Sequence, residues 1–408
     1  MQGNRLPAHG ALSGVRIADF TWLAAGPYGT QLLSFLGAEV IRFESRRRMD
    51  SYRRTSTTPG VEGRSRSLLF NDVNLNKMSV TVDLSTPEGI ALALDVVRVS
   101  DVVADNFSPG VMQRLGLGYD RLRRVRPDII VIASSSCGSD GPESRSVGYA
   151  PTFSALAGWG HLMGFPDMPP AESGRNTDLR VGAASAFALL AALNYRASTG
   201  RGQSIDLSAR EALTCSIGDM LLESQMTGRT PMRQANRTPG LAPHGVYRCK
   251  GEDAWVTIAV GSDEEWAALC AATGHPDWRD DSRFLDVYER CRHQDELDSL
   301  MAEWTLPHTP AEASDLLQKV GVAAMPCLSN RDLLQDRHLR FRGSFSDIEH
   351  SQLGPITVMG APWKFSDTPV RTPAPSPLVG QHTGWALADL LGRRPEEIAR
   401  LTEANILY

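Results

Sequence analysis

The chain has 408 residues, of which 42% are hydrophobic and 22% are charged, a composition typical of globular proteins and not of disordered or fibrous ones. The formal net charge is −5 and the pI is near 6.0, which argues against a nucleic-acid-binding protein with its usual basic excess. The length is sufficient for two or three domains. We therefore expect a folded, multidomain protein without a nucleic-acid partner.

Neither a targeting segment nor a membrane span is expected. Residues 1–12 lack the apolar stretch of a signal peptide, and the longest nearly apolar run, Val181 to Leu193, is too short to cross a bilayer. The six cysteines form no C-x-x-C pair and the nine histidines no H-E-x-x-H motif, so no metal site is expected. Scattered cysteines in a long chain are typical of a cytoplasmic protein.

The first 135 residues alternate between predicted strands and predicted helices. Thr86 is the expected N-cap of one helix, and Pro87 is its first residue. Alternation of this kind builds parallel βαβ units, so we predict an α/β fold with a doubly wound, Rossmann-like sheet. The strands are expected at 15–20, 38–43, 79–84, 101–105 and 127–134, and the helices at 28–36 and 87–98.

The rest of the chain predicts a second, smaller α/β domain. Residues 138–178 are rich in Gly, Pro and Ser and indicate long functional loops. Further strands are expected at 204–207, 255–260 and 356–359, and helices at 177–196, 262–273, 292–304, 311–319 and 384–391. The expected domains are a large Rossmann-like domain over 1–212, a linker over 213–245, the small domain over 246–325, and a return to the large domain over 326–408.

The first βαβ turn does not favour a dinucleotide. Residues 21–27 contain one glycine, Gly26, whereas a dinucleotide-binding fingerprint has three. The segment from Arg42 to Arg66 is nevertheless basic, with eight arginines and three acidic residues. Such a run forms either a solvated surface or a rim that binds phosphate groups through guanidinium forks, and the sequence leaves both interpretations open.

Two other segments carry side chains suited to a ligand. Asn106 and Phe107 follow a predicted strand and precede a helix that carries Arg114, a combination that suits the hydrogen bonding, stacking and charge of a nucleotide. Asp167 lies in a loop bounded by prolines, where it is either a solvated carboxylate or a preorganised nucleophile. The chain contains no G-x-S-x-G motif and no P-loop, so the common hydrolase and kinase classes have no support.

Ten short segments occur in a fixed order along nearly the whole chain. They are 12–20, 25–27, 35–42, 76–77, 86–89, 105–110, 199–203, 242–247, 360–362 and 380–383. Each segment alone is a weak signal, whereas the ordered set is specific. It resembles family III CoA-transferases (CaiB/BaiF), the group that includes formyl-CoA and carnitine CoA-transferases.

This resemblance implies a site and a reaction. Asp167, in a loop similar to the G-x-x-D-G-P-P of the family, is the implied catalytic nucleophile, and the loops of Gly138 and Gly240 are candidate oxyanion donors. No permanently bound cofactor is implied, since CoA thioesters are the substrates. The residues expected to contact CoA are Ala24, Ala25, Arg42, Arg46, Asn106, Phe107, Arg114 and Gly138.

The implied activity moves CoA from an acyl-CoA donor, such as succinyl-CoA, to a carboxylic acid acceptor through an aspartyl anhydride and an aspartyl–CoA thioester. Three departures from the family pattern argue against formate or oxalate and favour a different, larger acid. Met168 replaces a Gly, Ala24 stands where formyl-CoA transferases carry a Gln, and residues 238–241 keep little of their glycine-rich loop.

Two alternatives accompany this interpretation. The superfamily also contains α-methylacyl-CoA racemases, but Ala150 stands where their Asp is expected and no His lies between residues 10 and 160, which disfavours a racemase. The second alternative is that the chain is a non-catalytic or co-catalytic subunit of a heteromeric transferase, such as succinyl-CoA:benzylsuccinate CoA-transferase. The resemblance implies an interlocked dimer, and the sequence leaves open a homodimer or a heteromer with a related subunit.

Overall fold

The computed structural model describes residues 10–54, 63, 65–172 and 174–407, and these residues form two compact units. The first unit falls within Met1–His161, Glu172–Pro231 and His338–Tyr408, and the second comprises Leu162–Ala171 and Met232–Arg337. The expected small domain, 246–325, lies inside the second unit. The loop that carries Asp167 also belongs to the second unit, an assignment that requires tertiary contacts and is invisible in local sequence.

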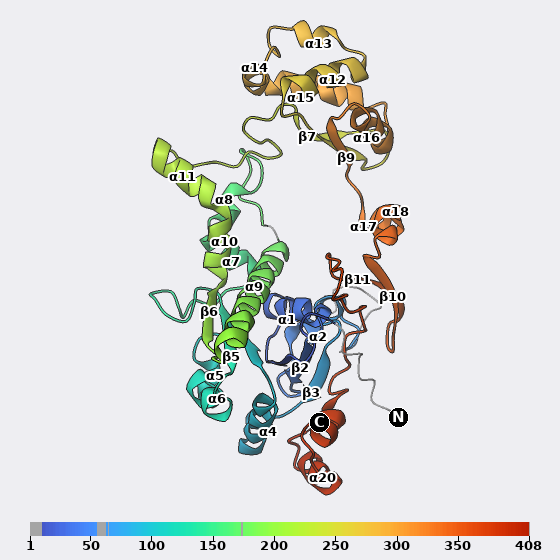
Figure 1. Ribbon diagram of the computed structural model, residues 1–408. Helices are drawn as coiled ribbons and strands as arrows, with labels where there is room; N and C mark the ends of the chain where they lie inside the picture. Colours follow the sequence, from blue (N-terminus) through green and yellow to red (C-terminus); the bar gives the residue numbers. More distant parts are fainter. Residues whose placement is uncertain (1–9, 55–62, 64, 173, 408) are drawn as a thin grey trace. The chain divides into compact units, whose positions relative to one another are not determined.

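The first unit is built on a six-stranded parallel sheet with the strand order β3-β2-β1-β4-β5-β6. This is the doubly wound order predicted for a Rossmann-like fold. Figure 1 labels β2, β3, β5 and β6 of this sheet. The order reverses between β1 and β4, so their carboxyl ends open a crevice in which such sheets bind ligands. The strands are β1 (Arg16–Asp19), β2 (Glu39–Glu44), β3 (Met78–Thr81), β4 (Val102–Asp105), β5 (Ile130–Ser135) and β6 (Ser204–Ser208).

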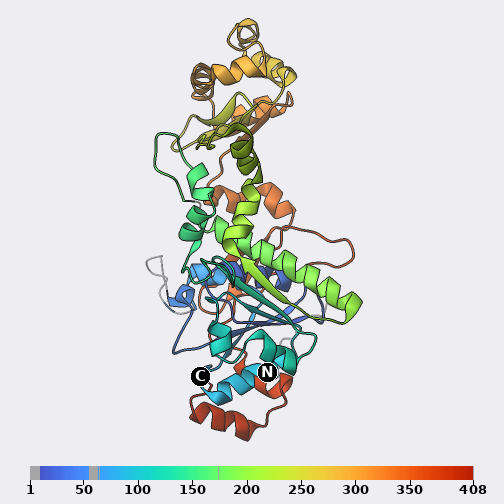
Figure 2. The ribbon, with the colours of Figure 1, turned by 90° about the vertical axis from the view of Figure 1, so that its left-hand side faces the viewer.

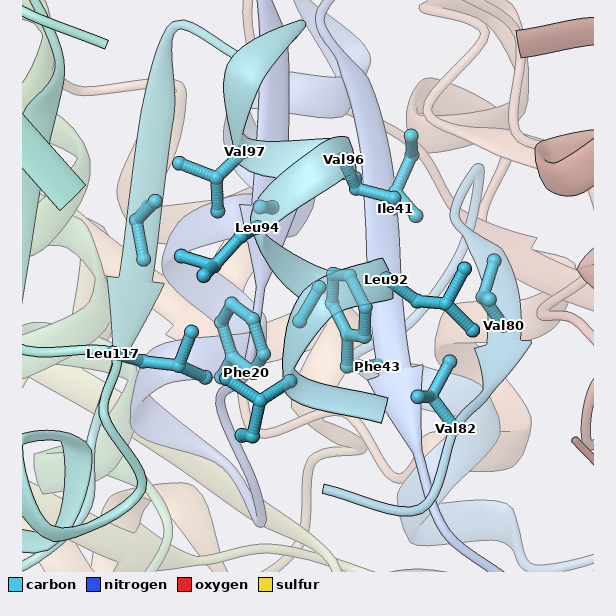
Figure 3. Close-up of a cluster of buried hydrophobic side chains, with 14 of the residues drawn as sticks. Phe20, Ile41, Phe43, Val80, Val82, Leu92, Leu94, Val96, Val97 and Leu117 are labelled. Atoms are coloured by element: carbon cyan, nitrogen blue, oxygen red, sulfur yellow. The ribbon is translucent and has the colours of Figure 1, made fainter. Parts of the chain in front are cut away.

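Helices cover both faces of this sheet because successive strand residues point to opposite sides. Ile17 packs with α1 (Ala25–Phe35) and α9 (Asn176–Thr199), whereas the next residue, Ala18, packs with α4 (Pro87–Arg98) and α6 (Tyr119–Val125). Figure 3 shows the second of these clusters, in which the rings of Phe20 and Phe43 stack with their centroids 4.4 Å apart. The expected cap is present, since Thr86 accepts a hydrogen bond from the backbone N–H of Gly89.

Helices α1 and α9 approach each other closely enough for their backbones to touch. A Cβ atom on Gly182 would lie 2.6 Å from the carbonyl oxygen of Ala25, and one on Gly29 would lie 2.8 Å from that of Gly182. Only glycine permits this approach. The first turns of α9, the long green helix in Figure 2, are therefore held beside the turn that follows β1.

The second unit contains a three-stranded antiparallel sheet of β7 (His244–Arg248), β8 (Trp255–Ala259) and β9 (Ala323–Pro326). Its core gathers around Trp266, which stacks with Trp278 at 6.4 Å between ring centroids. Its helices are α12 (Asp263–Thr273), α13 (Asp277–Asp280), α14 (Val287–Arg292), α15 (Gln294–Thr305), α16 (Pro310–Gln318) and α17 (Asn330–Gln335), with α18 (Arg337–Phe341) at its boundary.

The end of the chain returns to the first unit. An antiparallel hairpin of β10 (Phe345–His350) and β11 (Gly354–Met359) precedes a segment that lies along the outer edge of β3. There the carbonyl of Ser79 accepts a hydrogen bond from the N–H of His382 at 2.9 Å, and the N–H of Thr81 donates to the Thr383 hydroxyl at 3.0 Å. The final elements are α19 (Thr383–Trp385), the π-helix η2 (Ala386–Leu390) and α20 (Pro395–Glu403).

The structure contains several helices that the sequence did not predict. Residues 138–178 contain the helices α7 (Ala150–Leu156) and α8 (Trp159–Leu162), and the linker region begins with the short helix η1 (Cys215–Ile217) and α11 (Gly218–Thr227). Helix α20 follows the helix expected to be the last. The segment that forms α7 and α8 is rich in Gly, Pro and Ser and lacks the apolar periodicity on which sequence prediction depends. The remaining short helices are α2 (Ser51–Arg54), α3 (Leu68–Asp72), α5 (Val111–Arg114) and α10 (Ala209–Thr214).

Two properties of the described residues bear on function. None of their helices combines the length and apolar character that a membrane crossing requires. Within the same residues, no three His, Cys, Asp or Glu side chains gather closely enough to hold a metal ion.

Candidate active site

A cavity of about 470 Å³ opens in the first unit at the carboxyl ends of β1, β4 and β5. Its walls come from the turn after β1, the loop after β4, the serine-rich end of β5, helix α7 and the start of α9. This is the crevice that the strand order predicts. The cavity is lined by Trp22, Leu23, Ala24, Ala25, Tyr52, Asn106, Phe107, Ser108, Pro109, Ser134, Ser135, Ser136, Ser146, Val147, Gly148, Tyr149, Ala150, Pro151, Phe153, Glu172, Gly174, Arg175, Asp178, Val181 and Ala209.

The turn after β1 is held by buried charged groups behind it. Arg42 donates to the carbonyl oxygen of Thr21 at 2.7 Å and pairs with Asp50 at 2.5 Å, and Asp50 also accepts from the N–H of Leu23 at 3.1 Å. Leu23 has a φ of 63°, a left-handed conformation that costs energy for a side chain with Cβ. The network thus fixes the backbone on which Ala24 and Ala25 line the cavity.

The basic segment does not form a single exposed rim. Arg42 and Arg53 are fully buried, and Arg53 pairs with Glu44 at 2.6 Å, because both side chains turn into the interior beside β2. Arg42 therefore belongs neither to a solvated surface nor to an exposed phosphate-binding rim, and its burial gives no support to the expected contact with CoA. Arg46 is exposed, as is Arg48, whose guanidinium carbon lies 5.8 Å from the centre of the Trp22 ring. Arg64, part of the same prediction, lies outside the described residues.

Asn106 and Phe107 lie in the cavity wall, as the sequence suggested. The Asn106 amide, however, bonds in both directions to the backbone of Trp22, accepting from its N–H and donating to its carbonyl, each at 2.8 Å. Asn106 therefore ties the loop after β4 to the turn after β1. The Phe107 ring packs edge to face against the Trp22 ring with their centroids 5.5 Å apart, which gives this wall an apolar, aromatic surface. The neighbouring Asp105 is buried, and this burial raises its pKa to about 7.

The other predicted contacts are more dispersed. Arg114 is exposed at the end of α5, and Gly138 is buried in the loop after β5 with a φ of 85°. Neither is among the described residues that line the cavity. Next to Gly138, the N–H of Ser139 donates to Asp206 at 2.8 Å, so that loop is anchored to β6.

Asp167 occupies an exposed turn of the second unit. The N–H of Met168 donates to the carbonyl of Phe165 at 3.1 Å, which places Pro166 and Asp167 at the two central positions of a β-turn. Among the described residues, Asp167 has no hydrogen-bond or ion-pair partner and does not line the cavity.

A different carboxylate, Asp178, lies in the cavity wall and was missed by the sequence analysis. Asp178 belongs to the first turn of α9 and is half-buried. Burial raises its pKa to about 6, while the charge of Arg175 opposes this rise and that of Glu172 adds to it. An acidic residue in the first turn of a helix is common for structural reasons, so its sequence position gave no functional signal.

The cavity combines features that suit attack on an acyl derivative. A partly desolvated carboxylate that is still ionised near neutral pH is a competent nucleophile. The aromatic and aliphatic wall suits the apolar part of an organic ligand, and the volume is in the range of small-molecule sites. Hydroxyl groups of Ser134, Ser135 and Ser136 supply hydrogen-bonding capacity at the end of β5.

Comparisons with known proteins agree with this description. The model of CoA-transferase family III matches residues 12–383. The chain is 32% identical to a succinyl-CoA–D-citramalate CoA-transferase of Chloroflexus aurantiacus, over 97% of this chain and 98% of the relative. It is 29% identical to a formyl-CoA:oxalate CoA-transferase of Rhodopseudomonas palustris, over 97% of each.

Two further similarities extend this comparison. The alpha subunit of a succinyl-CoA–L-malate CoA-transferase from Chloroflexus aurantiacus is 31% identical, over 97% of this chain and 92% of the subunit. The crystal structure of a CaiB/BaiF family protein from Brucella suis superimposes with a TM-score of 0.85 and 28% identity, over 94% of this chain and 100% of that one. The chain therefore belongs to CoA-transferase family III, whose members transfer CoA between carboxylic acids.

Proposed function

We propose that this enzyme transfers CoA through a covalent intermediate on Asp178. The observation that carries this proposal is the position of the Asp178 carboxylate, half-buried in the wall of the cavity that also contains Ala24, Ala25, Asn106 and Phe107. Asp167, the nucleophile that the sequence resemblance implies, remains the alternative, and its exposed turn in the second unit supports that role less well.

The proposed reaction has four attacks, each of which breaks one bond as it forms another. A carboxylate oxygen of Asp178 attacks the thioester carbonyl, the C–S bond breaks, and CoA leaves as a thiolate. The thiolate then attacks the aspartyl carbonyl of this mixed anhydride, the C–O bond breaks, and the donor acid leaves as its carboxylate. The product is an aspartyl–CoA thioester.

The acceptor acid completes the exchange by the same chemistry. Its carboxylate attacks the aspartyl carbonyl and expels the CoA thiolate, and the thiolate attacks the acceptor's acyl carbon and releases the Asp178 carboxylate. The thioester bond energy is conserved throughout, so no ATP is consumed. We propose a donor such as succinyl-CoA and an acceptor larger than formate, in keeping with the names of two relatives that use succinyl-CoA.

A pair of matched variants tests the nucleophile. The purified chain is incubated with succinyl-CoA and then with hydroxylamine, which converts an aspartyl thioester or anhydride to a hydroxamate detectable by peptide mass spectrometry. We expect the label on the peptide that contains Asp178, its loss in Asp178→Asn, and its retention in Asp167→Asn. A label on the Asp167 peptide that persists in Asp178→Asn would overturn the assignment.

A second function is supported by one comparison. One relative is the alpha subunit of a heteromeric transferase, so this chain is alternatively one subunit of such an assembly. The two functions differ in the behaviour of the chain purified alone. Transfer by the isolated chain supports the homomeric enzyme, whereas transfer that requires a second, related protein supports the heteromeric one.

A further inference from the structure

Arg175 is the single basic side chain among the described residues that line the cavity, where Glu172 and Asp178 are the acidic ones. Its guanidinium pairs with Asp72 at 2.6 Å through Nη2, and Asp72 is not among the lining residues. The Nε atom is buried and has no hydrogen-bond partner among the described residues. The guanidinium carbon lies 6.0 Å from the centre of the Tyr52 ring, another residue of the cavity wall.

This arrangement leaves the Nε–H of Arg175 without an acceptor among the described residues. A buried guanidinium N–H without an acceptor costs free energy, and the cost is recovered when a ligand supplies an oxygen. The planar fork matches a carboxylate better than any other common acidic group except phosphate. Arg175 also precedes Asp178 by three residues at the start of α9, so the two side chains belong to the same end of the cavity.

The charges in the cavity determine which ligand the Arg175 guanidinium binds. The carboxylate that reacts at Asp178 enters a wall that already carries two acidic groups, and a second carboxylate on the same acid is repelled unless a cation offsets its charge. Within the described lining residues, Arg175 is the group able to do so. A monocarboxylic acid of the same length has no need of this cation.

We propose that Arg175 binds the carboxylate of the substrate acid that does not exchange CoA, and that this contact makes dicarboxylic acids and their mono-CoA thioesters the substrates. This assignment rests on the proposed function, because it places the reacting carboxyl at Asp178. Asp72 orients the guanidinium from outside the cavity. Arg175 is thus a specificity-determining residue, and an acid with an apolar terminus is a poor substrate.

Isotope exchange between a CoA thioester and its own free acid tests the proposal without knowledge of the physiological pair. Succinyl-CoA with labelled succinate represents a dicarboxylic acid, and butyryl-CoA with labelled butyrate a monocarboxylic acid of the same length. We expect the wild-type enzyme to prefer the first pair. Arg175→Gln lowers kcat/KM for that pair by about tenfold to a hundredfold, the loss of one charged hydrogen-bonded contact, and changes the second pair by less than about threefold.

Two control variants separate recognition from folding. Arg180 lies on the same helix, with its guanidinium carbon 4.6 Å from the centre of the Trp159 ring, and is not among the lining residues, so Arg180→Gln leaves the preference unchanged. Arg175→Lys keeps the charge without the fork and restores part of the preference. Circular dichroism melting of each variant identifies any general loss of structure.

Each outcome bears on the proposal. Equal exchange of both acids by the wild-type enzyme, exchange of neither acid, or an equal loss of both in Arg175→Gln overturns the role of Arg175. The hydroxylamine label on Asp178 is measured on the same samples with succinyl-CoA and with butyryl-CoA. Its presence without a preference between the acids overturns Arg175 alone, whereas its absence with both thioesters removes the proposed function itself.

Discussion

A carboxylate nucleophile must be ionised and yet poorly solvated, and at Asp178 both conditions meet near neutral pH. Burial raises its pKa from 3.8 to about 6, and the nearby Arg175 limits that rise. Burial removes part of the water that would otherwise solvate the carboxylate and lower its reactivity. Most molecules still carry the negative charge on Asp178 at pH 7. The local sequence around Asp178 contains no sign of this, because burial is decided by the elements that surround the start of α9.

The raised pKa predicts how activity depends on pH. Because the nucleophile is the ionised form, kcat/KM for succinyl-CoA exchange should fall as the pH drops through about 6, about tenfold per pH unit below that value. The measurement is a pH–rate profile with enzyme folding followed in parallel by circular dichroism. A rate that stays constant down to about pH 5 would contradict the role of Asp178.

The same shift predicts an effect on stability with a definite sign. The folded-state pKa lies above the unfolded value of 3.8, so the protonated carboxyl favours the folded state, and this contribution is lost as the pH rises from 3.8 through about 6. Asp178→Asn should therefore be more stable than the wild-type protein at pH 7 and gain little at pH 4. Urea denaturation at the two pH values measures this difference.

The buried pair of Arg42 and Asp50 predicts a stability loss of a different kind. Asp50→Asn leaves the fully buried Arg42 guanidinium without its closest anionic partner, which costs about 3–5 kcal/mol of unfolding free energy. Arg98→Gln, which breaks an exposed pair with Asp95, is the matched control and should cost less than about 1 kcal/mol. A similar, small loss in both variants would show that the network does not hold the turn after β1.

At the scale of elements, the strands and helices of the first unit were predictable because their sequence patterns agree with their tertiary environment. The helix 87–98 has its cap at Thr86, Pro87 at its first position and an apolar face, so local and global preferences coincide. Helices α7 and α8 lack this agreement. Their residues come from a segment rich in Gly and Pro, and they become helical through tertiary packing. Helix α7 packs on α9 and α10, and the Trp159 indole of α8 donates to the carbonyl of Leu213 in α10 at 3.0 Å.

The contact of α1 with α9 predicts that a single methyl group disrupts the site. In Gly182→Ala the new Cβ would lie 2.6 Å from the carbonyl oxygen of Ala25, so α9 must move and the protein should lose about 1–3 kcal/mol of stability. Because Ala25 and Asp178 lie on these two helices, the exchange rate should fall as well.

The control for this variant is another helical glycine. A Cβ on Gly218, in α11, meets none of the described residues within 4 Å, so Gly218→Ala should change stability by less than about 1 kcal/mol. Equal effects in the two variants, measured by urea denaturation and by succinyl-CoA exchange, would show that the close approach of α1 and α9 does not shape the cavity.

At the scale of the whole molecule, the alternation of strands and helices was enough to predict the parallel sheet and the position of its ligand crevice, since both follow from general rules of topology. The same pattern could not predict which side chains lie inside the crevice. Arg42 turned out to be buried, and Asp178 comes to the first βαβ turn only because α9 returns across the sheet after an intervening segment. Such placements depend on contacts between residues remote in sequence, which no local pattern encodes.

The assembly of the molecule gives the last prediction. Helix α11 buries none of its residues within the described chain, and it exposes Leu221, Leu222 and Met226, the last to 85%. Large apolar side chains that are exposed together on one helix are typical of a surface that another chain covers, and the family resemblance implies a dimer. We therefore expect light scattering after size-exclusion chromatography to report a dimer for the wild-type protein. Met226→Glu should shift it toward monomer, and Met226→Leu, which keeps the apolar area, should not. A monomeric wild-type protein that exchanges CoA at full rate would contradict this assembly.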